Sequence, residues 1–127
     1  MAMGERTAFG GSGARLTPRR ARMVTEYLRR QLRLSHQVRL ERISRWQVTG
    51  EDGRPGEPLV GVAHEKDGPC IFHTRALTVE DLVHEMLHVR HPELSEDEVN
   101  ARTAVMLRRM ARCADFRTTL RDNGPSD

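Results

Sequence analysis

The sequence predicts an α+β protein in which a helix, a short antiparallel sheet of about three strands and two further helices follow in that order. Three amphipathic segments begin after typical N-cap residues, at Thr17, Thr78 and Ser95. A turn signal at residues 66–69 separates two apolar runs, as in a β-hairpin. With 127 residues and a hydrophobic fraction of 37%, the chain suits one domain with a modest core.

Differences in composition set the expected limits of this domain. Residues 1–16 are rich in glycine and small polar residues without periodicity, so we expect a loosely ordered arm. Residues 17–116 form the folded domain, and residues 117–127 form a flexible tail that contains Asn123, Gly124 and Pro125. The first helix of the domain has Thr17 as its N-cap and Pro18 at its first position, and continues to about Leu34.

The expected strands lie between the first and second helices. Residues Val38 to Val48 alternate between apolar and polar side chains with one slip, which predicts a strand containing a bulge. Leu59 to His64 and Cys70 to Thr74 flank the turn at residues 66–69 and are predicted to pair as a hairpin.

Two helices are expected in the C-terminal half. The first begins after Thr78, with acidic residues in its first turn, and Pro92 ends it at about His91. The second has a capping box formed by Ser95 and Glu98 and continues to about Cys113 or Phe116. The connection between them is short, so the second helix is expected to fold back against the first.

The first of these helices carries a compact set of chemically active residues. His84 and His88 are four residues apart, and on a helix their imidazoles lie on one face and can reach one ion. Glu85 is rotated by about 100° from His84, so it can act on a zinc-bound water without being a ligand. The pattern therefore predicts a hydrolytic Zn²⁺ site in which Glu85 is the general base. The alternative is a surface helix with two solvated histidines.

A catalytic zinc usually takes three protein ligands, so one more is needed. His91 lies on the same helix stripe, but three ligands along one helix face would span about 10 Å, which is too far for bonds of about 2 Å. A carboxylate from the following helix is a better candidate. We favour Glu98, although it is also the capping-box glutamate, and Glu96 is the next candidate.

These residues resemble the minigluzincins, which are minimal zinc metallopeptidases with two motif histidines and a downstream glutamate. The resemblance covers residues 78 to about 104 and is carried by His84, Glu85, His88 and the segment from Pro92 to Val99. It implies a zincin-like fold and peptide-bond hydrolysis, with Cys70 to Thr74 as the sheet-edge strand that binds a peptide or protein substrate. It also implies that a tail or a second copy of the chain can inhibit the enzyme.

A more distant similarity, through Glu98 to Ala101 and Ala104, is to regulatory proteases resembling ImmA and IrrE; Arg102 stands where an aromatic residue is usual. An alternative function is therefore a regulatory or non-catalytic protein that zinc stabilises. A further alternative is a DNA-associated protease anchored by its arginine-rich first helix.

Overall composition limits the partners and the compartment. The net charge of +3 is spread along the chain and aromatic residues make up only 4%, so nucleic-acid binding is not favoured. No segment is apolar enough for a signal peptide or a membrane span, and we expect a cytoplasmic protein without a membrane partner. Cys70 and Cys113 have no paired metal-ligand spacing, so free thiols are expected rather than a disulfide.

Overall fold

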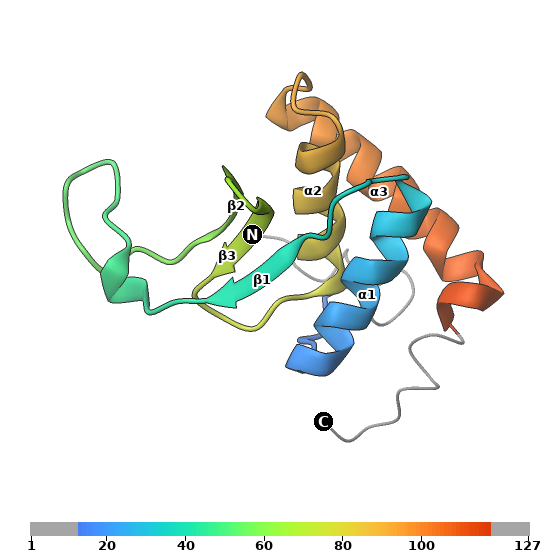
Figure 1. Ribbon diagram of the computed structural model, residues 1–127, viewed down its shortest axis with the longest axis horizontal. Helices are drawn as coiled ribbons and strands as arrows, with labels where there is room; N and C mark the ends of the chain where they lie inside the picture. The colour runs from blue at the N-terminus through green and yellow to red at the C-terminus, as the bar shows by residue number, and fades with distance from the viewer. Residues whose placement is uncertain (1–12, 118–127) are drawn as a thin grey trace.

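The structure, a computed structural model, describes residues 13–117 and confirms the α+β class. Helix α2 lies between the sheet and α3, with α1 packed beside it (Figure 1). The predicted arm and tail lie almost wholly outside the described residues. The elements are α1 (Pro18–Gln31), β1 (Arg39–Arg42), the 3-10 turn η2 (Arg45–Gln47), β2 (Val60–Glu65), β3 (Gly68–His73), α2 (Val79–Arg90) and α3 (Glu96–Arg112).

All three helices begin where their N-cap residues predict. The Thr17 hydroxyl accepts a hydrogen bond from the Arg20 backbone N–H at 3.2 Å, and Thr78 and Ser95 each form a capping box. Helix α1 ends at Gln31, three residues earlier than expected. The reason is local, because Arg33 adopts a left-handed conformation (φ 56°) that turns the chain out of the helix. None of the helices in the described part of the chain is long and apolar enough to cross a membrane.

The sheet is mixed rather than antiparallel. Strands β2 and β3 form the predicted antiparallel hairpin, but β1 pairs in parallel with β3, with Leu40 opposite Ile71. The strand order is β1-β3-β2, so β3 is the central strand. The expectation that Cys70 to Thr74 form the sheet-edge strand is therefore wrong. A tight turn forces β2 and β3 to be antiparallel, whereas the long connection between β1 and β2 leaves the direction of β1 free.

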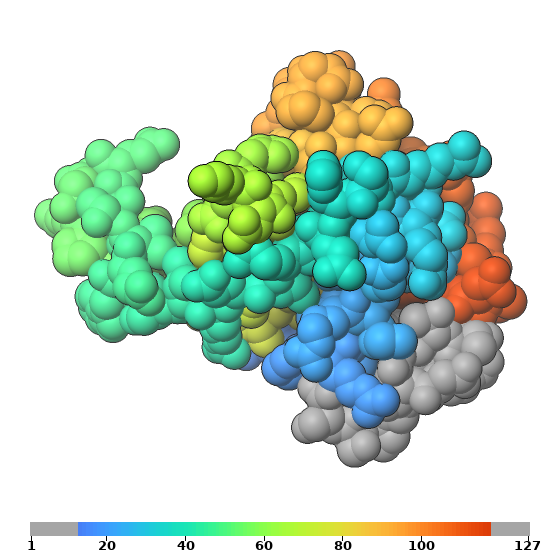
Figure 2. Space-filling view, viewed as in Figure 1, coloured from blue at the N-terminus to red at the C-terminus, as the bar shows by residue number. Residues whose placement is uncertain are grey.

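The prediction of one long strand from Val38 to Val48 is also wrong. Strand β1 ends at Arg42, and the slip in the alternation marks η2, where the Ser44 hydroxyl accepts a hydrogen bond from the Trp46 backbone N–H. Residues 43–59 form a protruding loop that extends away from the helices (Figures 1 and 2). At its base Trp46 is 68% exposed, and Gly56 (φ +91°) lies against the indole, where any larger side chain would clash.

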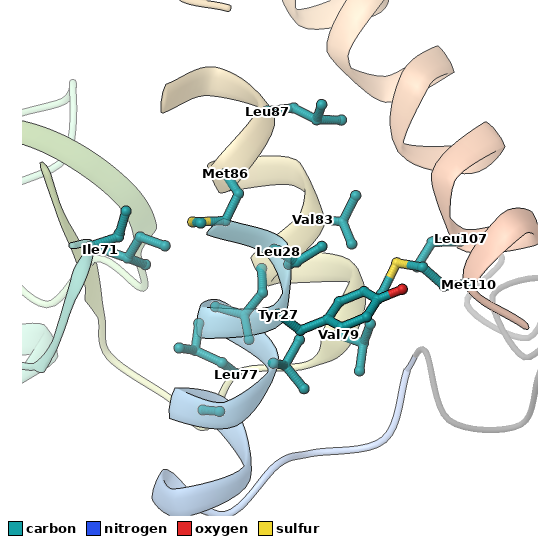
Figure 3. Close-up of a cluster of buried hydrophobic side chains, with 14 of the residues drawn as sticks. Tyr27, Leu28, Ile71, Leu77, Val79, Val83, Met86, Leu87, Leu107 and Met110 are labelled. Carbon is teal, nitrogen blue, oxygen red and sulfur yellow. The ribbon is translucent and has the colours of Figure 1, made fainter. Parts of the chain in front are cut away.

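One apolar core joins the three helices to one face of the sheet (Figure 3). Tyr27 packs against Phe116 with ring centroids 5.1 Å apart, and its hydroxyl lies 3.3 Å from the Cys113 sulfur. Both cysteines are free thiols, and Cys70 is buried in the sheet. The core holds α2 on two sides and thereby fixes the helix that carries the histidine motif. Its fully buried side chains include Val24, Leu28, Ile71, Leu77, Val79, Leu82, Val83, Met86 and Val99.

Candidate metal centre

Helix α2 presents His84 and His88 on one face, one turn apart. Their ring centroids are 4.8 Å apart and the rings meet edge to face at 69°. The buried residues of α2, including Leu82, Val83 and Met86, lie on its other faces and anchor it in the core. The two imidazoles are about one-fifth exposed, at 19% for His84 and 24% for His88. They are therefore held in place yet accessible from solvent.

Glu96, the first residue of α3, completes the group. The chain turns between α2 and α3 through residues 91–95, and α3 packs back along α2. This turn places one Glu96 oxygen 2.8 Å from His84 Nε2 and the other 3.0 Å from His88 Nε2. One nitrogen from each histidine and one Glu96 oxygen all lie within 4.8 Å of one another. Side chains from two helices thus converge on a single point.

This set of donors fits a small divalent cation. Zinc bonds of about 2.0–2.1 Å to nitrogen and oxygen imply ligand atoms about 3.4 Å apart in a tetrahedron. The nitrogen-to-oxygen distances of 2.8 and 3.0 Å are slightly shorter than this, and the widest separation in the group is up to 4.8 Å, so the side chains would have to adjust by up to about 1.4 Å to surround an ion. Two imidazole nitrogens and one carboxylate oxygen are a common set for zinc and related divalent metals.

The structure does not bring Glu98, the carboxylate favoured from the sequence, to the histidines; Glu96, the next candidate, lies there instead. The Glu98 carboxylate accepts the Ser95 backbone N–H at 2.8 Å, while the Ser95 hydroxyl accepts the Glu98 N–H at 3.1 Å. Hydrogen bonding to Ser95 also holds the pKa of Glu98 below its ordinary value. The Glu98 carboxylate is thus used in the capping box, whereas the Glu96 carboxylate takes no part in that cap. His91, excluded as a ligand, lies outside the group, with Nδ1 at 3.5 Å from Glu93.

Glu85 lies next to His84 in sequence but in a different environment. The residue is only 8% exposed. Burial, with smaller contributions from the negative charges of Glu96 and Asp81, raises the pKa of Glu85 to about 7. A carboxylate with this pKa can take up and release a proton near neutral pH, which is the property of a general base or acid.

A cavity of about 360 Å³ adjoins both His84 and Glu85. Its walls come from the first two turns of α2 and from Pro58, Leu59 and Val60, which lead into β2. Arg75 is the only arginine among the described residues that line this cavity. No sequence pattern singles out Arg75, because it lies in the link between β3 and α2 and belongs to no motif.

Arg75 forms a network that fixes the start of α2. Its guanidinium donates two hydrogen bonds to the Asp81 carboxylate, at 2.6 and 3.0 Å. The same carboxylate accepts the Thr78 backbone N–H at 2.9 Å, which is half of the capping box. Although burial alone would raise the pKa of Asp81, these hydrogen bonds hold it below its ordinary value. The network thus secures the helix one turn before His84.

We predict that Asp81→Asn lowers the free energy of unfolding by about 1 kcal/mol at pH 7, since Arg75 is partly exposed and the ion pair is screened. A carboxylate whose pKa is lowered by folding stabilises the fold above its unfolded pKa and loses that effect as the pH falls through its folded pKa. The difference between variant and wild type should therefore shrink below about pH 4. Urea unfolding of the zinc-free proteins from pH 3 to pH 8 measures it; a difference independent of pH would contradict the prediction.

Tyr27 and the histidines of the sheet lie elsewhere or have local partners. Tyr27 belongs to the core, beside Cys113 and Phe116. His73 Nδ1 lies 2.7 Å from the Arg75 carbonyl oxygen, and His64 lines a separate cavity with His36. None of these side chains joins the group formed by His84, His88 and Glu96 in the described structure.

Fold and site together define a small α+β domain with a candidate metal site of two histidines and a glutamate, spaced on two helices as in an HExxH motif followed by a downstream glutamate. Comparison with known protein families, with curated proteins and with solved structures finds no match to this chain.

Proposed function

We propose that this protein is a zinc-dependent peptidase in which His84, His88 and Glu96 hold the ion and Glu85 is the general base. The observation that carries the proposal is the convergence of three ligand atoms within 4.8 Å, directly beside a buried carboxylate. The resemblance to minigluzincins supports the same assignment, because those enzymes use two motif histidines and a downstream glutamate.

The chemistry divides between the ion and Glu85. A zinc ion held there supplies Lewis-acid chemistry, lowering the pKa of water and polarising a carbonyl group. A Glu85 carboxylate oxygen accepts a proton from the attacking water and then delivers it to the leaving amine. Burial of Glu85 supports this role, because a carboxylate withdrawn from water holds a proton more readily than an exposed one.

A peptide is the substrate class that best fits the surroundings of the site. Strand β2 is an edge strand, and residues at its start line the same cavity as His84 and Glu85. The free edge of a strand can pair with an extended peptide, which would lay the peptide across this cavity. The edge expected from the sequence, at Cys70 to Thr74, is thus replaced by that of β2.

Removal and return of the metal test the proposal. The chelated protein should leave a mixture of unstructured peptides intact, and one equivalent of zinc should restore cleavage, whereas magnesium should not, because magnesium favours oxygen ligands. Mass spectrometry of the products detects cleavage directly. Cleavage that persists after complete chelation, or that no transition metal restores, would rule out a metal-dependent peptidase.

The rival function is a regulatory protein in which zinc only holds the fold together. One observation favours it, since the three side chains join α2 to α3 and an ion there would pin the two helices. A purely structural ion has no need of a buried carboxylate beside it, and structural zinc sites are usually closed by four protein ligands. Zinc that raises the thermal unfolding midpoint while no peptide is cleaved would support the rival.

A further inference from the structure

A second groove lies at the other edge of the sheet from the metal centre. It has a volume of about 630 Å³ and runs between β1 and α1. Both elements are labelled in Figure 1. The metal centre adjoins β2, and β1 and β2 are the two outer strands of the sheet. Nothing in the proposed hydrolysis uses the β1 groove.

One wall of the β1 groove is the backbone edge of β1. Successive side chains of a strand point to opposite faces, so a cavity on one face contacts every second residue. This groove is instead lined by every residue from 37 to 42. Strand β1 pairs only with β3 among the strands of the described chain, so its outer backbone groups face the groove. Such an edge can accept another strand.

The opposite wall is a single stripe of α1, and the floor is apolar. The α1 residues that line the groove are spaced at intervals of three and four, as on one helix face. Apolar side chains line the space between the two walls. The α1 wall includes Ala21, Arg22, Thr25 and Glu26, and Leu40 and Leu77 form part of the floor.

The rim of the groove is positively charged. Three arginines and two glutamates line the groove: Glu26 is paired with Arg29 at 2.6 Å, while Glu41 lies 4.0 Å from Arg39, whose guanidinium also donates a hydrogen bond to Glu65. Arg22 and Arg42 also line the groove, and no acidic side chain of the described residues lies within ion-pair distance of either. The rim therefore offers two guanidinium groups to an incoming anion.

We propose that the β1 groove binds an extended, acidic peptide segment of a partner protein. The segment adds to the free edge of β1 through backbone hydrogen bonds and directs alternate apolar side chains onto the floor beside Leu40 and Leu77. Its acidic side chains pair with Arg22 and Arg42. The edge formed by residues 37–42 is about 20 Å long, enough for about six residues of an extended chain.

The test uses a fluorescein-labelled peptide of alternating valine and glutamate, about eight residues long. Fluorescence anisotropy should show binding to the full-length protein, equally with and without zinc. The Arg22→Gln/Arg42→Gln double variant should weaken binding by about tenfold, while Arg108→Gln/Arg109→Gln, which also removes two exposed guanidinium groups but from α3, should alter it by less than about twofold. Thermal unfolding establishes that all variants are folded.

Two altered peptides decide how the segment is held. A peptide with lysine in place of glutamate should not bind, because the rim is cationic. A peptide with N-methyl groups at alternate backbone nitrogens should also fail, because it cannot pair with a strand edge. Equal binding of the methylated peptide would show that the groove takes apolar anions without strand addition. That result, unchanged binding by the double variant, or no binding at all would overturn the proposal.

Discussion

Replacing Glu85 by glutamine is expected to lower peptide hydrolysis by about 10³-fold while leaving zinc binding intact. Glutamine has nearly the same size and shape as glutamate but cannot accept a proton from water. The residue is buried, and its carboxylate has a raised pKa because burial opposes ionisation. A neutral amide at this position costs no more than a buried carboxylate, so the variant should be at least as stable as the wild type.

Zinc content and turnover must be measured on the same preparations. The matched control is Glu93→Gln, which removes one carboxylate from the exposed connection between α2 and α3, where Glu93 lies near His91. That control should retain both zinc and activity. Undiminished cleavage by Glu85→Gln would exclude Glu85 as the base. Loss of zinc together with activity would instead show that Glu85 helps to bind the ion.

Local signals in the sequence predict most of the fold. Thr17, Thr78 and Ser95 mark the helix starts because capping depends on residues within one turn. The hairpin at residues 66–69 is equally local. The direction of β1 is not local, since a long connection separates it from β2 and no short-range pattern determines which strand it joins. The errors in the direction of pairing and in the assignment of the sheet edge both have this cause.

The candidate site divides in the same way. His84, Glu85 and His88 belong to one helical turn, so their spacing alone places the two imidazoles together. The third partner depends on how the chain turns between α2 and α3. Glu96 and Glu98 are two residues apart and therefore point in different directions on α3, and only the packed structure shows which one faces the histidines.

Replacing each of these two glutamates by glutamine should have different effects on zinc binding: Glu96→Gln should largely abolish it and Glu98→Gln should leave it unchanged. Each variant removes one negative charge from the same turn of α3, so the pair is matched in charge and position. Glutamine at position 98 can still complete the capping box with Ser95, which keeps the start of α3 in place. Glutamine at position 96 leaves two imidazoles and a neutral amide, a much weaker set for a divalent cation.

We expect the zinc affinity of Glu96→Gln to fall by more than about 100-fold, since even loss of an outer-sphere partner commonly costs 10–100-fold. Competition with a chromophoric chelator measures the affinity, and the rise in the unfolding midpoint on adding zinc gives an independent readout. Glu98→Gln should match the wild type in both. Loss of zinc only in Glu98→Gln would mean that α3 shifts on binding the ion and breaks its own cap, since the Glu98 carboxylate accepts the Ser95 backbone N–H in this structure. Equal retention by both variants would leave His84 and His88 without a glutamate partner and would remove the proposed gluzincin-type site.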